Sequence, residues 1–429
     1  MAQEFPKLKL ERSMALFEEA KRLSPGGVMG IRRPYNFVQG EYPIFIDKGY
    51  GGHIVDVDGN DYIDMLCAYG PIILGYNEPE INYEVIRQIT EKGFCFSLVQ
   101  KVQNDFEKRI TEIVPCAEQV IPVKTGSDAT TLATRIARGY TGRKMILRCG
   151  YHGWHDWCVE NHGGVPEETL ALTDEFEYGQ IEDLEKKLAA HKGDVACIII
   201  TPVGHPGAKP IIPPPPGYLQ AVRDIATKNG VVLVFDEVRT GFRVAMGGAQ
   251  ERYGVTPDLA TFGKAVANGY PLSMVAGKRE IMSVCESKVF VSSTYFPNSL
   301  EMVAALKCLE ILEREKVQES IWARGTKFLS DLTRVVEKSG VPATVSGIPP
   351  MPYVTFDQGK GEAAGTPGER VYKARREYFY TQTIRRGLFI QPYHHWYIAH
   401  RHTDADLAKA LWAIEESLEL TAKKFPVNK

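Results

Sequence analysis

The central part of the chain alternates short apolar runs with longer segments that are apolar on one side only. The apolar runs predict buried strands at residues 144–148, 195–201, 230–236, 259–262, 272–276 and 289–292. The amphipathic segments predict helices at residues 128–140, 182–191, 218–228 and 299–314. Strands that alternate with helices are typical of an α/β fold, so we expect a mainly parallel sheet covered by helices on both faces.

The two ends of the chain have a different pattern. Residues 1–60 contain one helical stretch at 13–23, a Pro-Gly-Gly turn and a polar hairpin around residues 58–60. The C-terminal part predicts a strand at 353–356, a glycine-rich loop at 359–368, and long helices at 319–339, 369–386 and 405–424. We therefore predict a large domain at 61–314 and a small α+β domain built from 1–60 and 315–429.

The charge balance excludes several classes of protein. The 429 residues include 51 Lys and Arg against 53 Asp and Glu, so no basic excess is present to bind nucleic acid. The apolar runs are too short to span a membrane, and the first residues lack the apolar core of a signal peptide. None of the eight cysteines forms a Cys-x-x-Cys pair, so zinc-binding and thioredoxin-type motifs are not indicated. We interpret the cysteines as buried free thiols. We expect a cytoplasmic protein.

Two ionisable residues lie where predicted strands end. Asp236 closes the most apolar run, and ligands of parallel sheets bind beyond the carboxyl ends of the strands. A carboxylate there either binds a cationic group or serves as a helix cap or a structural ion pair. Lys264 follows an apolar run and precedes small residues, a setting in which a partly buried amine loses its proton and acts as a nucleophile. A lysine whose amine reaches the surface fits the same pattern.

Two further segments contain groups suited to an anion and to a flat ring. Gly126 and Ser127 stand between a strand-like run at 120–123 and a helix, where free backbone N–H groups bind phosphate or the two residues act only as a cap. The segment 151–157 offers aromatic rings that either stack on a ligand or pack in the core. It contains two histidines without a third metal ligand at a familiar spacing, so we predict no metal site.

Taken together, these groups match the requirements of pyridoxal phosphate (PLP). This cofactor needs a lysine that forms a Schiff base, a carboxylate that pairs with the pyridinium nitrogen, an anion cradle and a ring that stacks on it.

Longer motifs strengthen the prediction. They include residues 23–28, 56–64, 125–129, 138–143, 151–153, 235–243, 257–264 and 402–404. Through these motifs the chain resembles, over nearly its whole length, the class III (fold-type I) PLP-dependent aminotransferases. The similarity is to the branch with glutamate-1-semialdehyde aminomutases and β-amino-acid and amine aminotransferases. The resemblance implies a mainly parallel seven-stranded-type sheet sandwiched by helices, with a smaller α+β domain.

The resemblance also implies a role for each matching residue around the cofactor ring. Lys264 is expected to be the Schiff-base lysine and the base that moves the proton. Asp236 is expected to pair with the pyridinium nitrogen, and Val238 to lie under the ring. Tyr151 is expected to stack on the other face of the ring, with His152 as a further cofactor-binding residue.

The phosphate end implies a second subunit. Gly126 and Ser127 correspond to the phosphate cradle of the family. Thr294 corresponds to a threonine that reaches the phosphate from the neighbouring subunit, which implies a homodimer with active sites at the interface.

The substrate pocket departs from the commonest family pattern. Residues 201–205 stand where many members have Glu-Pro, and residues 293–299 depart from the usual Gly-Thr-Phe-x-Gly-Asn-Pro. Residues 67–71 and 392–394 are closer to fumonisin-type amine, β-amino-acid and 3-aminobutyryl-thioester aminotransferases. The residues expected to contact the substrate are Arg33, Tyr69, Trp154, His394 and Arg401. Either arginine suits a carboxylate, because its guanidinium makes two parallel hydrogen bonds, and either arginine also fits a surface ion pair.

The implied reaction is a ping-pong aminotransfer. An amino group moves from a non-α donor (a β-amino acid, a 3-aminoacyl thioester or a primary amine) to a 2-oxo acid such as pyruvate or 2-oxoglutarate. Two alternatives remain open, a PLP-dependent aminomutase of the glutamate-1-semialdehyde type, which needs no second substrate, and a non-catalytic PLP-binding relative.

Overall fold

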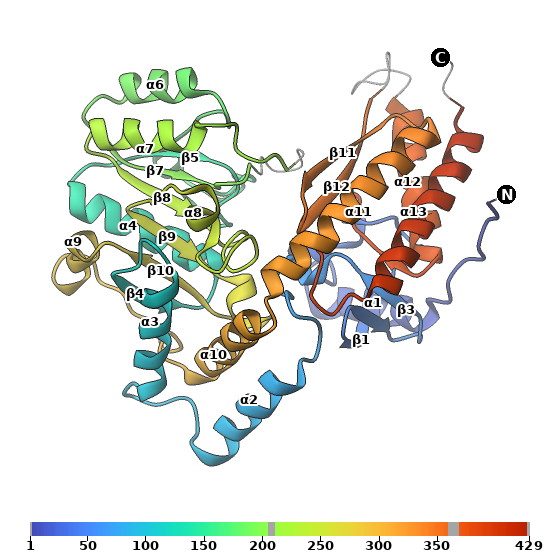
Figure 1. The fold of residues 1–429 in the computed structure, drawn as a ribbon, viewed down its shortest axis with the longest axis horizontal. Coiled ribbons are helices and arrows are strands. Elements are labelled where there is room, and N and C mark those ends of the chain that lie inside the picture. Colours follow the sequence, from blue (N-terminus) through green and yellow to red (C-terminus); the bar gives the residue numbers. More distant parts are fainter. Residues whose placement is uncertain (1, 205–210, 359–368, 427–429) are drawn as a thin grey trace. The chain divides into compact units, whose positions relative to one another are not determined.

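The computed structural model describes residues 2–204, 211–358 and 369–426. Within it, contacts divide the chain into two compact units (Figure 1). We call residues 70–72 and 79–318 the sheet unit, and residues 1–69, 73–78 and 319–429 the terminal unit. The glycine-rich loop predicted at 359–368 lies outside the described residues. The three-block domain division made from the sequence stays a prediction.

The sheet unit is built on a seven-stranded sheet with the order β4-β10-β9-β8-β7-β5-β6. Its strands are β4 (Gln119–Val123), β5 (Met145–Cys149), β6 (Thr173–Glu175), β7 (Val195–Ile200), β8 (Val232–Asp236), β9 (Leu259–Phe262) and β10 (Ser273–Gly277). The strands from β9 to β6 are parallel, whereas β10 runs antiparallel to both β9 and β4. This confirms the predicted mainly parallel α/β sheet.

The central strands β7 and β8 explain why apolar runs identified this sheet. Every residue of both strands is buried, as expected where helices cover the two faces of a parallel sheet. The strand β8 ends at Asp236, so this carboxylate lies at the edge of the sheet where the parallel strands have their carboxyl ends.

Helices surround the sheet within the same unit. They are α2 (Pro79–Glu91), α3 (Lys101–Ile113), α4 (Gly126–Thr141), α5 (Glu167–Leu170), α6 (Ile181–Ala190), α7 (Tyr218–Lys228), α8 (Gly248–Tyr253), α9 (Arg279–Met282) and α10 (Ser299–Arg314). Figure 1 shows α10 near α2 and α3, which it contacts, and α7 between α6 and the sheet. The sequence did not single out α2 and α3. The short helices η4 (Lys264–Ala267) and η5 (Ser283–Glu286) complete the unit.

One predicted strand is wrong. Residues 289–292 form no strand, although they are apolar at Val289, Phe290 and Val291. The neighbouring strand β10 already pairs with β9 on one edge and with β4 on the other. Val289 instead packs into the core beside α4, while Phe290 remains 82% exposed.

The terminal unit joins both ends of the chain. Its first part contains α1 (Glu11–Leu23), β1 (Ile46–Tyr50), β2 (His53–Asp56) and β3 (Asp61–Asp64), with the short helices η1 (Gly30–Arg32), η2 (Pro34–Asn36) and η3 (Cys67–Tyr69). Its second part contains α11 (Val317–Ser339), β11 (Ala343–Ile348), β12 (Met351–Phe356), α12 (Glu369–Arg385), β13 (Leu388–Phe389) and α13 (Asp404–Lys424). The strand β13 pairs with β3, so the two parts share one sheet of order β1-β2-β3-β13.

The structure also tests two expectations that came from composition. In the part of the chain that the structure describes, no helix combines the length and the apolar character needed to cross a membrane. All eight cysteines are free, but Cys95 is exposed and Cys285 half-buried, so the expectation that all of them are buried is wrong.

Candidate active site

Asp236 and His152 form a buried pair at the carboxyl edge of the sheet. Nδ1 of His152 lies 2.7 Å from Oδ2 of Asp236, and both side chains are almost completely buried. Among the described residues, Nε2 of His152 has no hydrogen-bond partner. Because a buried N–H without a partner is costly, we place the hydrogen on Nδ1, from which it is donated to Asp236.

The other oxygen of Asp236 is also held. Its Oδ1 accepts hydrogen bonds from the backbone N–H of Val238 at 3.1 Å and from the hydroxyl of Thr261 at 3.2 Å. Three donors from three different parts of the chain therefore fix the carboxylate in one orientation. Such fixed carboxylates are suited to bind a cationic group, because little reorganisation is left to occur on binding.

The N-terminus of α4 lies beside Val238. Thr125 and Asp128 form a capping box that starts this helix. A Cβ atom added to Gly126 would lie 2.9 Å from Cγ1 of Val238, so glycine allows the helix terminus to approach this closely. The N–H groups of the first turn and the helix dipole favour an anion at such a terminus.

Lys264 begins η4, directly after the strand β9. Its backbone adopts a left-handed conformation with φ of 45°, which is costly for a residue with a side chain and is concentrated at functional sites. Burial lowers the pKa of Lys264 from its ordinary value near 10.5 to about 7. A neutral amine, which the nucleophilic role requires, is therefore well populated near pH 7.

Sequence reasoning missed two arginines that act on Lys264. After burial, the positive charge of Arg239 is the largest influence that lowers the pKa of Lys264, and Arg243 contributes in the same direction. The carboxylate of Asp236 opposes them. Arg243 is fully buried and donates to the carbonyl oxygens of Gly70 and Ile72 at 2.7 and 3.3 Å. Both arginines belong to the motif 235–243, but a motif does not show which way its side chains point.

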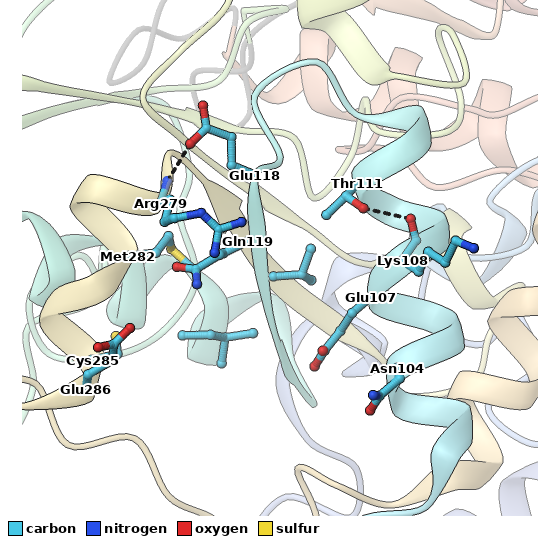
Figure 2. Close-up of a pocket in the computed structure, with 12 residues that line it drawn as sticks. Asn104, Glu107, Lys108, Thr111, Glu118, Gln119, Arg279, Met282, Cys285 and Glu286 are labelled. Carbon is cyan, nitrogen blue, oxygen red and sulfur yellow. Dashed lines mark hydrogen bonds between the residues drawn. The ribbon is translucent and has the colours of Figure 1, made fainter.

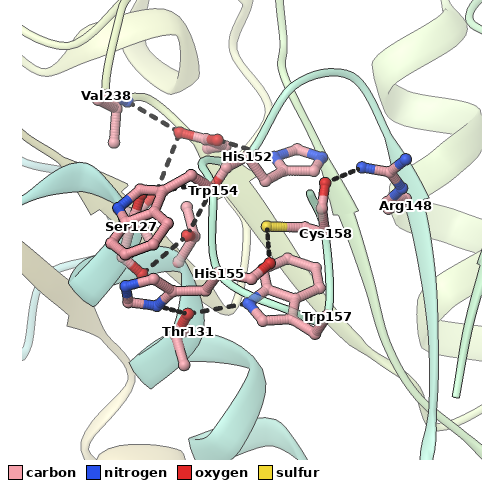
Figure 3. Close-up of polar contacts among 12 residues, drawn as sticks. Ser127, Thr131, Arg148, His152, Trp154, His155, Trp157, Cys158 and Val238 are labelled. Atoms are coloured by element: carbon pink, nitrogen blue, oxygen red, sulfur yellow. Dashed lines mark hydrogen bonds and ion pairs between the residues drawn. The ribbon is translucent and has the colours of Figure 1, made fainter. Parts of the chain in front are cut away.

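The aromatic segment after β5 divides into a buried and an exposed part. Trp157 stacks with His152, the two rings lying 6.1 Å apart and nearly parallel, and its Nε1 donates to the hydroxyl of Thr131. Figure 3 shows Thr131 between Trp157 and His155, to which it is also hydrogen-bonded. Trp154 is 70% exposed and Tyr151 is 42% exposed, so their rings have a free surface in this chain.

Two further residues, Ser127 and Thr294, were predicted to bind the phosphate of the cofactor. Ser127 is buried, and its hydroxyl accepts a hydrogen bond from the backbone N–H of Trp154 at 3.3 Å. Thr294 lies in an exposed segment before α10 and makes no hydrogen bond to any residue that the structure describes. The predicted roles of both residues toward a phosphate stay predictions.

The predicted substrate residues other than Trp154 lie in the terminal unit. Tyr69 ends η3, in which Cys67, Ala68 and Tyr69 all have positive φ values. Three consecutive left-handed residues are strained, so other contacts must hold them. The hydroxyl of Tyr69 donates to the carbonyl of Ile31 at 2.9 Å, and its ring meets the ring of His394 edge-on at 5.2 Å.

Asp64 holds the strained turn. Its Oδ1 accepts from the backbone N–H of Leu66 at 2.7 Å, and its Oδ2 accepts from the hydroxyl of Tyr76. Burial raises the pKa of Asp64 to about 6, although these hydrogen bonds oppose the shift. Asp64 was matched within a family motif but was not predicted to support Tyr69.

The two predicted arginines differ in their ionic partners. Nε of Arg401 donates to Oε2 of the buried Glu78 at 3.1 Å. Nε of Arg33 donates to the carbonyl oxygen of Val28 at 3.2 Å, and no carboxylate among the described residues pairs with it. Arg33 therefore retains an uncompensated charge, whereas the charge of Arg401 is balanced by Glu78.

A separate pocket lies in the sheet unit. It has a volume of about 470 Å³ and is formed by α3, β4, α9 and η5 (Figure 2). Charges of both signs line it, including Glu107, Lys108 and Arg279, and the backbone N–H of Arg279 donates to Glu118 at 2.9 Å. None of the predicted site residues lines this pocket. In the described part of the chain, no group of three or more potential metal-ligating side chains gathers.

Comparisons with known proteins identify the family of this chain. A family model described as aminotransferase class-III matches residues 35–403. The chain is 58% identical over 412 residues to the 3-aminobutyryl-CoA aminotransferase of Cloacimonas acidaminovorans, covering 96% of this chain and 98% of the relative. It is 35% identical over 428 residues to the glutamate-1-semialdehyde 2,1-aminomutase of Persephonella marina, covering 95% and 99%. The FumI protein of Sphingopyxis sp. MTA144, solved in a PLP form, superposes with a TM-score of 0.90 at 27% identity and 98% coverage of both chains.

The residues of the sheet unit fit PLP, the cofactor of this family. They include a fixed carboxylate at Asp236 that is suited to a cationic ring nitrogen, a helix terminus at Gly126 that is suited to an anion, and an amine of lowered pKa at Lys264. Val238 lies next to two of these elements, since Cβ atoms added to Gly126 and Gly263 would come within 2.9 and 3.6 Å of it. The chain is therefore a PLP-dependent enzyme and belongs to the class-III aminotransferases.

Proposed function

We propose that this aminotransferase takes its amino group from a 3-amino acid, in particular one carried as a thioester, and passes it to a 2-oxo acid such as pyruvate or 2-oxoglutarate. The observation that carries the proposal is the 58% identity, over nearly the whole of both chains, to a 3-aminobutyryl-CoA aminotransferase. Relatives called glutamate-1-semialdehyde aminomutases are more distant at 33–35%. An aminomutase is the alternative that this difference disfavours.

Lys264 carries the proton in this proposal. Its Nζ accepts a proton when it is neutral, and the pKa of about 7 makes the neutral and charged forms similarly abundant near pH 7. The same amine is thus suited to remove a proton from the donor carbon and to deliver it again.

The remaining residues hold the cofactor. When bound, PLP supplies a positively charged ring that withdraws electrons from the carbon at which the proton is lost. We assign Asp236, backed by His152, to the ring nitrogen, Val238 and Tyr151 to the two faces of the ring, and Gly126 and Ser127 to the phosphate.

We also infer a homodimer that acts in the cytoplasm. The partner's Thr294 would complete the phosphate site, and the exposure of the segment that contains Thr294 in a single chain supports this role. Phe290 and Tyr295 in the same region are 82% and 60% exposed, as expected of residues that a second subunit covers. Eight free cysteines support a reducing compartment. Sedimentation of the purified protein tests the dimer, and a monomer at micromolar concentration contradicts it.

A donor screen tests the reaction. The purified enzyme is incubated with 3-aminobutyryl-CoA, free 3-aminobutyrate or glutamate-1-semialdehyde, each with and without a 2-oxo acid. We expect amino transfer from 3-amino donors only when the acceptor is present. Turnover of glutamate-1-semialdehyde without an acceptor, at the rate of the best donor or faster, would show an aminomutase instead. The Lys264→Ala variant serves as the inactive control.

A further inference from the structure

An arginine in the terminal unit packs against two tyrosine rings. The guanidinium carbon of Arg376, on α12, lies 4.2 Å from the ring centre of Tyr393 and 5.3 Å from that of Tyr372. Arg376 also donates a hydrogen bond to the hydroxyl of Tyr393. Tyr393 is 44% exposed, so part of this side chain is open to a ligand. The stack fixes the guanidinium without neutralising its charge.

This cluster continues to the predicted substrate residues of the same unit. Tyr393 is followed in the chain by His394, whose ring meets the ring of Tyr69 at 5.2 Å. A second arginine contacts Tyr69, because the guanidinium carbon of Arg32 lies 5.6 Å from the ring centre of Tyr69. Arg376 and Arg32 thus each contact a ring, and the two ring contacts are connected through the chain neighbours Tyr393 and His394 and through Tyr69.

Neither arginine is balanced by a carboxylate in the described part of the chain. Nε of Arg376 is buried and has no hydrogen-bond partner there either. Other arginines of this unit are paired, for example Arg385 with Glu41 at 2.8 Å and Arg401 with Glu78 at 3.1 Å. Arginines without a carboxylate partner, one of them beside the exposed ring of Tyr393, are suited to an anionic ligand that also contains a flat base.

We propose that Arg376, Arg32 and Tyr393 form a subsite for the phosphorylated nucleotide tail of a coenzyme A thioester donor. Guanidinium groups bind phosphate with two parallel hydrogen bonds, and a tyrosine face stacks on a purine. The proposal rests on the proposed function, because only a thioester donor brings a nucleotide to the enzyme. Free 3-aminobutyrate lacks these groups and gains nothing from the subsite.

The test compares two thioesters that share the reacting end. 3-Aminobutyryl-CoA carries the nucleotide tail, whereas the N-acetylcysteamine thioester of 3-aminobutyrate lacks it. For the wild-type enzyme we expect a KM at least tenfold lower for the coenzyme A thioester. Arg376→Ala and Arg32→Ala are expected to raise that KM about tenfold each and to leave the KM of the short thioester within twofold. Arg334→Ala, which removes a 71% exposed arginine of the same unit, is the matched control and is expected to change neither.

Two further measurements separate binding from folding. Adenosine 3′,5′-bisphosphate should inhibit the wild-type enzyme competitively against the coenzyme A thioester, and Arg376→Ala should weaken this inhibition about tenfold. Arg376→Lys keeps the charge and should fall between wild type and Arg376→Ala. Equal effects of Arg376→Ala on both thioesters, or none on either, would overturn the subsite while leaving the proposed function standing. Absence of turnover with any 3-amino donor would instead refute the proposed function.

Discussion

The two sets of predicted site residues are built in opposite ways. In the sheet unit, Asp236 and His152 are buried at the end of a fully buried strand, and both carboxylate oxygens of Asp236 are hydrogen-bonded. In the terminal unit, Tyr69 stands on a strained left-handed turn, and Arg33 has an uncompensated charge. The comparison indicates that the residues proposed for the chemical step are fixed by hydrogen bonds in a buried site, whereas those proposed for the substrate depend on a strained turn and an unpaired charge. Substitutions in the first set should therefore lower kcat, and substitutions in the second should raise KM.

The largest effect is expected for Lys264→Ala. Loss of the amine removes both the nucleophile and the base, so kcat should fall by about 10⁴-fold. Steady-state amino transfer measures this effect. Lys288→Ala, which changes an exposed lysine of the same unit, should retain full activity. A Lys264→Ala enzyme that keeps a tenth of the wild-type rate would contradict the assignment.

Asp236→Asn should come next, with a loss in kcat on the order of 10²–10³-fold, because a fixed charge is removed from the centre of the site. Thr261→Val removes a single hydrogen bond from a neutral donor to the same carboxylate, worth about 1.5 kcal/mol, and should lower kcat about tenfold. The ratio between the two variants is the informative result. Equal losses would show that the geometry of the carboxylate, rather than its charge, is what matters.

The rate at which Lys264 reacts with PLP should depend on pH, and this effect should be smaller than the effects on kcat above. Only the neutral amine reacts, so its rate of covalent capture of PLP should rise about tenfold per pH unit and level off above a pKa of about 7. To measure this rate, PLP is added to the cofactor-free protein, the covalent adduct is reduced with borohydride at set times, and the adduct is quantified by mass spectrometry. Arg239→Gln removes a positive charge that lowers this pKa, so the curve should shift to higher pH. Arg135→Gln, an exposed change on α4, should not shift it.

Asp64→Asn should have the smallest effect, and on KM alone. Asp64 with a pKa of about 6 is ionised at pH 7 and gains its proton as the pH falls through 6, which weakens its hydrogen bonds to the turn before Tyr69. The wild-type KM for the donor should therefore rise severalfold between pH 7 and pH 5. In Asp64→Asn the KM should be raised at both pH values and nearly constant. Asp61→Asn, on the same strand, should keep the wild-type dependence of KM on pH. A lowered kcat in Asp64→Asn would contradict the division between residues that affect kcat and residues that affect KM.

The parts of the molecule that were predicted from sequence share a physical cause. The strands β7, β8 and β9 are buried throughout and mostly apolar, so their position and the placement of Asp236 at a strand end followed from the pattern. Residues 289–292 are also mostly apolar but form no strand, because Val289 packs into the core beside α4, and the sequence does not reveal this packing. The effect of Arg239 on Lys264 depends on side-chain direction, and the role of Asp64 depends on a backbone conformation that non-glycine residues seldom adopt.

The sheet of the terminal unit can be completed only late in the synthesis of the chain. The hydroxyl of Tyr42 donates to the carbonyl of Ile390, 348 residues later, and β3 lacks its neighbour β13 until that region has left the ribosome. All strands of the sheet unit are made before β13. During synthesis one edge of β3 therefore stays unpaired until β13 has been made, while all strands of the sheet unit are already present. Binding by a chaperone during translation would be of most use to the N-terminal segment that contains β3.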